Sequence, residues 1–214
     1  MKLKELFLSA LYPEAVACCV CNKEASLNDH GLCAVCEELI VPAPLFSLSE
    51  PVDSAAAGIK YNDAAADMVH RFKYYDGRYL GKNLASFMVL PAEWRADVMI
   101  PVPLHPERLK ERGYNQSLIL AEELGKRYGI PVRDDLLKRI RNTLMQSMTS
   151  REERRTNVKD AFRASKRCRG LSIILVDDVI TSGSTAEECA KALKAAGADK
   201  VYVIAACYAG GQEN

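Results

Sequence analysis

Apolar and polar positions alternate along the chain with spacings that predict helices and strands in turn. Positions 63–90 follow a helical spacing that is interrupted near Gly77, and positions 115–128 follow it again up to Gly129. Short apolar runs predict strands at 97–102, 136–141, 171–176 and 201–206. Because a further helix is predicted at 184–196, the last third forms a βαβ unit, which implies a parallel sheet with a right-handed crossover.

The start of the chain predicts an amphipathic packing helix rather than an export signal. Glu5 interrupts the apolar segment and Pro13 ends it, so the segment is too short for a signal peptide. The helical spacing is carried by Leu3, Leu6, Phe7, Ala10 and Leu11. No stretch approaches the roughly 18 consecutive apolar residues that a membrane helix needs. We therefore expect a cytoplasmic protein without a membrane span.

Composition and charge suit one α/β domain with a small appendage. The chain has 214 residues, of which 49% are hydrophobic and 27% are charged, and its formal net charge is +1. These values exclude a disordered chain, a coiled coil and a uniformly basic nucleic-acid coat. Three prolines within 41–51 indicate a linker. We expect a small N-terminal unit at 1–45, which contains the first helix and a cysteine-rich segment, and a larger domain at 46–214.

Four of the eight cysteines have the spacing of metal ligands. Cys18 and Cys21 form one C-x2-C pair, Cys33 and Cys36 form another, and eleven residues separate the pairs. Four such thiolates surround one Zn²⁺ and leave no position for water, which predicts a structural zinc site. A redox thiol pair is the alternative, but it would need only one C-x2-C. Cys19 is a spare cysteine beside this site. The scattered cysteines are expected to be small buried residues: Cys168, Cys189 and Cys207.

The stretch 174–186 carries the strongest signal for chemistry. An apolar strand delivers two adjacent carboxylates, Asp177 and Asp178, and a loop of small residues then leads into a helix. Backbone N–H groups of such a loop and helix start suit a phosphate monoester, and Gly183 allows close approach of the backbone. Hydroxyl donors are added by Thr181, Ser182, Ser184 and Thr185. The carboxylates then face the neighbouring part of the ligand, for which the paired hydroxyls of a ribose are good candidates.

Alternative fold classes account less well for the acidic pair. G-x-G-x-x-G and G-x4-G-K-[ST] are absent, which argues against a dinucleotide-binding fold and a P-loop. A receiver domain also has an acidic pair after a strand, but there the pair opens the domain, and here only 36 residues follow Asp178. An acidic pair that merely precedes an ordinary helix is the remaining alternative.

Several motifs resemble those of one family and occur in the same order. Residues 174–186 resemble the phosphoribosyl pyrophosphate (PRPP) motif of type I phosphoribosyltransferases. The N-terminal cysteines, Ile-Pro-Val-Pro-Leu-His at 100–105, Arg-Gly-Tyr-Asn-Gln at 112–116 and the stretch 146–162 resemble the ComF family of competence-associated proteins. The resemblance covers essentially the whole chain. It implies an α/β fold of the type I phosphoribosyltransferase kind, with a parallel sheet flanked by helices and a small N-terminal zinc ribbon.

The resemblance also implies roles for individual residues. Asp177 and Asp178 would contact the ribose hydroxyls and stabilise positive charge on the ribose, and residues 181–185 would hold the 5′-phosphate. The loop 102–105 would approach the pyrophosphate, where His105 is either a contact or only a polar loop residue. Arg112 would clamp the pyrophosphate, and Arg108 either joins it or belongs to a solvated helix face. Arg151, Arg154 and Arg155 would close over the pyrophosphate from a mobile loop, and Mg²⁺ would share in neutralising its charge.

Two functions of different kinds follow. The first is transfer of a phosphoribosyl group from PRPP to an unidentified acceptor. The second, which the resemblance implies as cellular context, is handling of single-stranded DNA with DNA-processing proteins in natural transformation, with the PRPP site kept as a sensor or a relic. Between positions 138 and 169, eleven basic residues stand against three acidic ones, an excess that either a pyrophosphate or a DNA backbone could use. Base stacking within this run has little support, because Phe162 is its only aromatic residue.

Overall fold

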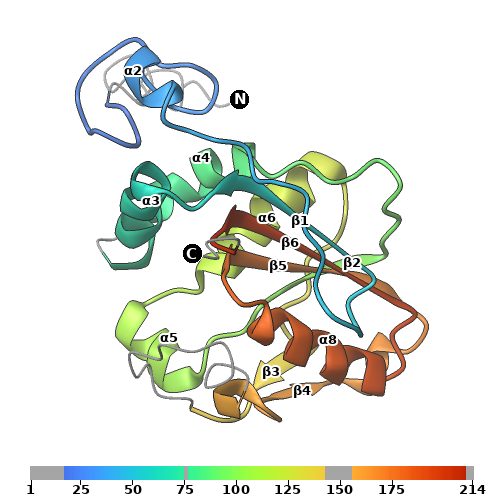
Figure 1. Ribbon diagram of the computed structural model, residues 1–214. Coiled ribbons are helices and arrows are strands. Elements are labelled where there is room, and N and C mark those ends of the chain that lie inside the picture. The colour runs from blue at the N-terminus through green and yellow to red at the C-terminus, as the bar shows by residue number, and fades with distance from the viewer. Residues whose placement is uncertain (1–16, 75–76, 143–155, 211–214) are drawn as a thin grey trace, which may run out of the picture.

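The computed structural model of the chain describes residues 17–74, 77–142 and 156–210 (Figure 1). The helix expected at the start of the chain lies outside these residues, as does the segment with Arg151, Arg154 and Arg155. Across the described ranges, no helix has both the length and the apolar character that a membrane crossing requires.

A four-stranded parallel sheet forms the centre of the molecule. Its strands run in the order β1 (Ser54–Lys60), β6 (Lys200–Tyr208), β5 (Ser172–Ile180) and β2 (Val98–Pro101). The helix α8 (Ser184–Ala195) connects β5 to β6. The predicted βαβ unit and the parallel sheet are therefore confirmed.

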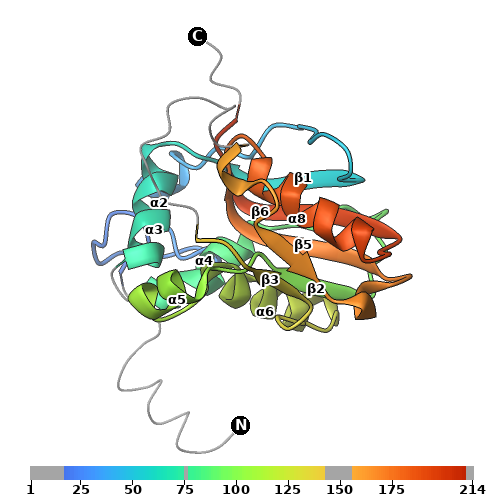
Figure 2. The ribbon, with the colours of Figure 1, turned by 90° about the horizontal axis from the view of Figure 1, so that it is seen from below.

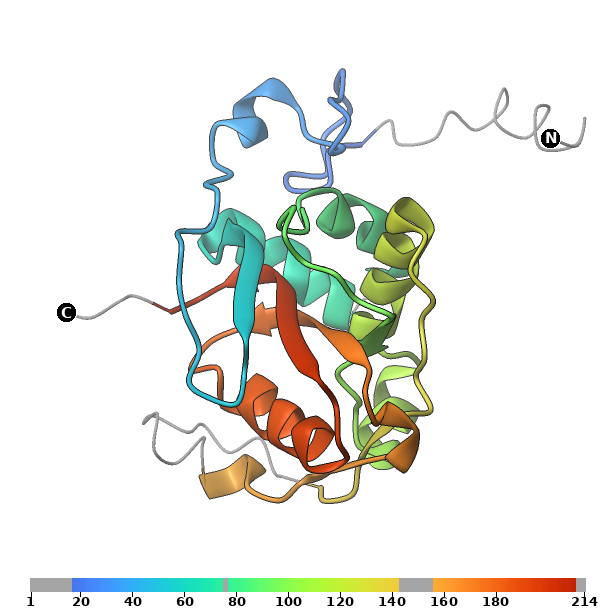
Figure 3. The ribbon, with the colours of Figure 1, turned by 90° about the vertical axis from the view of Figure 1, so that its right-hand side faces the viewer.

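Helices cover both faces of this sheet (Figure 3). One face packs against α3 (Asp63–Tyr74), α4 (Leu80–Ser86) and α6 (Gln116–Tyr128). The other face packs against α8, which crosses β5 and β6 (Figure 2). Successive strand residues point to opposite faces, so Ile174 packs with the first group of helices and Ile173 packs with α8. Burial on both faces makes β5 a continuous apolar run, which explains why the sequence predicts it clearly.

Two strands differ from the sequence prediction. β5 does not end at Val176 but continues through both aspartates to Ile180. The strand β1 was not predicted, because its sequence of small residues, Ser-Ala-Ala-Ala-Gly-Ile-Lys, lacks a β-branched pattern. It forms a strand because it pairs with β6 along its length.

Several smaller elements lie outside the main sheet. The expected strand at 136–141 is present as β3 (Leu137–Arg139), which pairs antiparallel with the unpredicted β4 (Phe162–Ala164). The unpredicted helix α5 (Pro106–Arg112) follows β2 and begins at a proline, whose fixed φ suits the first helical position. Shorter helical turns among the described residues include α2 (Ala34–Glu37), η1 (Gly77–Tyr79) and η2 (Lys166–Cys168).

The proline-containing segment 41–51 lies along the sheet and contacts α8. The Ala43 N–H donates to the Gly58 carbonyl of β1 at 3.1 Å. Further on, the Ser49 N–H donates to Glu187 Oε1 of α8 at 3.1 Å. The segment therefore connects the cysteine-rich region to the sheet and covers part of the exposed edge of β1.

The cysteine-rich segment, residues 17–40, lies beside α3 and α4 at one end of the molecule (Figure 1). The Arg71 guanidinium of α3 donates to the carbonyl oxygens of Cys19 and Val20. Cys19 is buried, and its Sγ atom lies 3.6 Å from Met68 Sδ. The spare cysteine is thus a packing residue between this segment and α3.

Candidate functional site

The two adjacent carboxylates of β5 line one cleft, and each is held by a different helix. Asp177 Oδ1 accepts hydrogen bonds from Ser117 Oγ of α6 at 3.1 Å and from the Asp178 N–H at 2.9 Å. Asp178 Oδ2 forms an ion pair with Lys73 Nζ of α3 at 3.0 Å. The pair therefore connects β5 to the first turn of α6 and the last turn of α3.

Burial and neighbouring charges set the electrostatics of the pair. Burial raises the pKa of Asp177 to about 7, and the charge of Asp178 acts in the same direction. Burial lowers the pKa of Lys73, but the charge of Asp178, its hydrogen bond with Lys73 and the charge of Asp177 together outweigh burial, and the net direction is upward. Lys73 is therefore a permanent cation beside the pair, whereas Asp177 changes its charge near neutral pH.

The loop after β5 and the first turn of α8 form a hollow next to the carboxylates. Gly183 is the N-terminal cap of α8 and has a φ of +81°, in the left-handed region. A Cβ atom there would lie 2.5 Å from Leu48 Cδ2, so a larger residue would also clash. Backbone N–H groups at a helix start bind anions. The residues that add hydroxyl groups to this hollow are those predicted from the sequence: Thr181, Ser182, Ser184 and Thr185.

A wider cleft of about 330 Å³ continues from this hollow. The cations that line it come from α3, α5 and β3, and they are Lys73, Arg108, Arg112 and Arg139. Arg112 donates to Gln116 Oε1 at 2.8 Å, and its guanidinium lies over the Tyr74 ring, 5.1 Å from the ring centroid. A phosphate-sized hollow, two carboxylates and a cationic cleft therefore follow one another along a single groove.

Residues of this groove that were not among the predicted site residues include Lys73, Ser117 and Arg139. Ser117 directly follows the Arg-Gly-Tyr-Asn-Gln motif, so the motif itself was a usable signal. Lys73 had no such signal, because it lies in a helix whose spacing indicated packing alone. Only the folded chain brings the end of α3 to the end of β5.

The remaining predicted residues differ in where they lie. Arg112 lines the cationic cleft, and its contact with a pyrophosphate stays a prediction. His105 caps α5, where its side chain accepts from the Glu107 N–H at 3.4 Å, and it is not among the residues that line the cleft. Arg151 and Arg154 lie outside the described residues, so their contact with the pyrophosphate stays a prediction.

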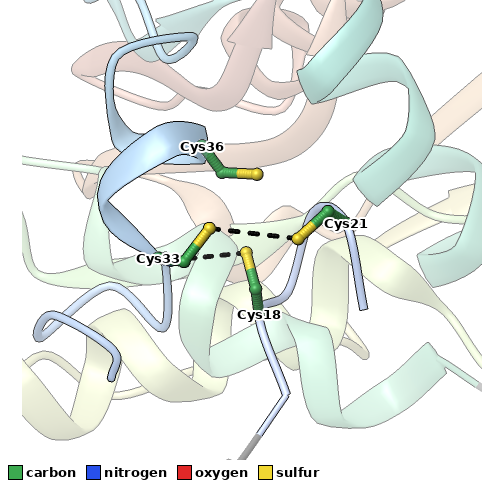
Figure 4. Close-up of side chains that lie close together, drawn as sticks. All are labelled: Cys18, Cys21, Cys33 and Cys36. Carbon is green, nitrogen blue, oxygen red and sulfur yellow. Dashed lines mark hydrogen bonds between the residues drawn. The ribbon is translucent and has the colours of Figure 1, made fainter. Parts of the chain in front are cut away.

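The four cysteines with ligand spacing converge in the structure (Figure 4). The Sγ atoms of Cys18, Cys21, Cys33 and Cys36 all lie within 4.8 Å of one another. Burial opposes ionisation of Cys18, but hydrogen bonds led by the one from the Cys33 N–H outweigh it and lower the thiol pKa to about 6. Four thiolates at this separation suit a tetrahedral ion such as zinc. The three scattered cysteines are buried, as expected.

Comparisons with known proteins give the same fold and family context. Residues 114–214 match the family described as phosphoribosyl transferase domain. Competence protein F of Haemophilus influenzae is 27% identical over 215 residues, which cover 87% of this chain and 94% of that protein. DNA utilization protein YhgH of Salmonella typhimurium is 29% identical over 217 residues, covering 89% and 96%. Competence protein ComFC of Bacillus subtilis is 28% identical over 183 residues, covering 82% and 70%.

These findings identify the class of the protein. The chain contains a phosphoribosyltransferase-type domain, built on a parallel sheet flanked by helices, with an N-terminal cysteine cluster that fits a zinc ribbon. It is a homologue of competence protein F, ComFC and YhgH, and the resemblance to the ComF family is confirmed.

Proposed function

We propose that the protein binds PRPP with Mg²⁺ and transfers its phosphoribosyl group to an acceptor. The observation that carries the proposal is the order of groups along the groove: the hollow at the start of α8, then Asp177 and Asp178, then the cationic cleft. PRPP presents the matching groups in the same order, since a 5′-phosphate, a ribose diol and a pyrophosphate follow one another.

Each part of the groove has a role in this proposal. The N–H groups and hydroxyls of residues 181–185 hold the 5′-phosphate. The ribose hydroxyls donate to Asp177 and Asp178. The pyrophosphate lies toward Arg108 and Arg112, and Arg151 and Arg154 close over it. Bound Mg²⁺ supplies neutralisation of the pyrophosphate charge.

The chemistry consists of positioning and charge stabilisation. The bond between C1 of the ribose and the pyrophosphate oxygen breaks, and the pyrophosphate leaves with the electron pair. A nitrogen of the acceptor attacks C1 from the opposite side and loses its proton to solvent. The ribose gains positive charge in between, which the ionised carboxylates of Asp177 and Asp178 stabilise. Because the pKa of Asp177 is about 7, transfer is expected to increase as the pH rises through neutrality.

We further propose that the cysteine cluster holds one structural zinc ion and that residues 1–45 form a small N-terminal unit docked against the larger domain at 46–214. The short segment around α2 buries little apolar surface of its own, since Val35 and Leu39 are exposed. Four metal–sulfur bonds would stabilise it by on the order of 10 kcal/mol. A site closed by four thiolates leaves no position for water, so zinc has no part in the transfer step.

Calorimetric titration of PRPP with Mg²⁺ into the zinc-loaded chain tests the main proposal. The variant Asp177→Asn with Asp178→Asn should lose binding by at least about a hundredfold, because two charge-assisted hydrogen bonds are removed. Glu122→Gln with Glu123→Gln, an adjacent pair on α6 away from the groove, is the matched control and should bind as the unmodified chain does. Unchanged affinity in the aspartate variant would refute the site assignment.

Binding of single-stranded DNA is the second candidate function. Lys138 of β3 and Arg163 of β4 are directly opposed in register, and both are exposed. Like charges opposite each other on a strand pair are unfavourable unless an anion lies between them. The names competence protein and DNA utilization protein, borne by the relatives, agree with such a ligand.

A further inference from the structure

The last turn of α3 contacts both candidate sites. Its residue Arg71 donates hydrogen bonds to the carbonyl oxygens of Cys19 and Val20. Two positions later, Lys73 forms the 3.0 Å ion pair with Asp178. Residues two apart on a helix point in nearly opposite directions. The same turn therefore faces the cysteine cluster on one side and the acidic pair on the other.

This turn is held firmly between the two contacts. Phe72 is fully buried in the core that α3 shares with the sheet. The Tyr114 hydroxyl donates to the Phe72 carbonyl. Close-packed interiors transmit displacements rather than absorb them. A shift of the Arg71 end of the turn would therefore move the Lys73 end as well.

The acceptors of Arg71 belong to the metal-binding knuckle itself. Cys19 and Val20 are the two residues between the ligand pair Cys18 and Cys21. A metal ion that holds both thiolates fixes the backbone between them, and with it the direction of the two carbonyls. Without the ion, nothing ties the sulfur atoms of Cys18 and Cys21 together, so the backbone between them can change direction and Arg71 can lose its acceptors.

We infer that Arg71 is a positioning residue, which acts through the last turn of α3 to place Lys73 beside Asp178 when the cysteine cluster holds its metal. The inference rests on the proposed PRPP site and deepens it, since it makes ligand binding at the acidic pair depend on metal binding at the cysteines. Coupling of this kind is reciprocal. Metal should strengthen PRPP binding, and PRPP should slow metal loss.

The placement of Lys73 can be measured without PRPP. We would expose the zinc-loaded chain to an amine-reactive reagent and follow modification of Lys73 by mass spectrometry. The ion pair with Asp178 should protect Lys73, and Arg71→Ala should raise the rate about fivefold to tenfold. Lys82→Ala, which removes an exposed cation from α4, is the matched control and should leave the rate unchanged. Arg71→Lys keeps the charge and should give an intermediate rate, so the test survives if the alanine variant folds poorly.

PRPP binding supplies the second measurement. Zinc content of Arg71→Ala should stay at one ion per chain, while its affinity for PRPP with Mg²⁺ falls about tenfold. In the unmodified chain PRPP should slow transfer of zinc to a chelating dye, and in the variant it should not. Equal Lys73 reactivity in the unmodified chain, the variant and the zinc-stripped chain would overturn the inference. Raised reactivity without any PRPP binding would support the coupling and refute the proposed function instead.

Discussion

Asp177→Asn should make the protein more stable at alkaline pH while removing its proposed activity. In the folded chain burial raises the pKa of this carboxyl from 3.8 to about 7, so the folded state holds the proton more tightly than the unfolded chain does. Stability is therefore lost as the pH rises from about 4 to about 7, where the unfolded chain is ionised and the folded chain must follow. Asparagine is never charged, so the variant avoids this loss.

The magnitude follows from the two pKa values. Each pH unit between the unfolded and the folded pKa lowers the unfolding free energy of the unmodified chain by about 1.4 kcal/mol. For a carboxyl fully shielded from water this gives about 4 kcal/mol. Asp177 is only partly buried and Lys73 lies nearby, so we expect roughly half of this, or about 2 kcal/mol at pH 8. The difference in unfolding free energy between Asp177→Asn and the unmodified chain should grow by about 1 kcal/mol from pH 5 to pH 8. The asparagine oxygen can still accept the Ser117 hydroxyl.

Urea unfolding of the zinc-loaded chain at pH 5 and pH 8 measures this effect. Asp67→Asn, which removes an exposed carboxylate from α3, is the control. Its difference in unfolding free energy from the unmodified chain should be the same at pH 5 and pH 8. A difference between Asp177→Asn and the unmodified chain that is the same at both pH values would contradict the reasoning. So would a variant that is less stable than the unmodified chain at pH 8.

Two further predictions concern the metal and the basic strand pair. Chelation of zinc, or Cys33→Ser, should speed amide hydrogen exchange over residues 17–45 and leave β5 and β6 protected. The reason is that metal–sulfur bonds take the place of a hydrophobic core only in that segment. Less than one zinc per chain after purification under reducing conditions would count against the zinc site. Lys138→Ala with Arg163→Ala should make the plot of log binding constant against log salt concentration less steep for single-stranded DNA. The slope should fall by about 1.4 in magnitude, because each lost phosphate contact removes about 0.7. An unaltered slope would exclude these strands from the DNA interface.

Local chemistry explains which parts of the molecule could be predicted from the sequence. The run that forms β5 is apolar because the strand is buried on both faces, and this signal survives without knowledge of its neighbours. Helix α6 has Asn115 and Gly129 as its two caps, so both of its ends were visible. The cysteine spacing and the acidic pair before a small-residue loop are also local, and they led to the four converging cysteines and to the hollow beside the acidic pair.

Other features depend on contacts between distant parts of the chain. β1 has little strand propensity of its own and becomes a strand only by pairing with β6. The cationic cleft takes its cations from three elements. Lys73 is partly buried against Asp178, although its own surroundings in the sequence are those of a packing helix. The cost of burying one such charge is offset only by the other.

The sequence by itself thus determined the class of the protein: the alternating elements of a parallel sheet, four cysteines with the spacing of metal ligands and the loop that suits a sugar phosphate. Only the tertiary structure decided that one turn of α3 contacts both the cysteine knuckle and the acidic pair. The physical reason is that helix spacing, metal-ligand spacing and turn chemistry act over a few residues. Ion pairs and carbonyl contacts between Arg71, Lys73 and their partners instead depend on how helices pack against the sheet.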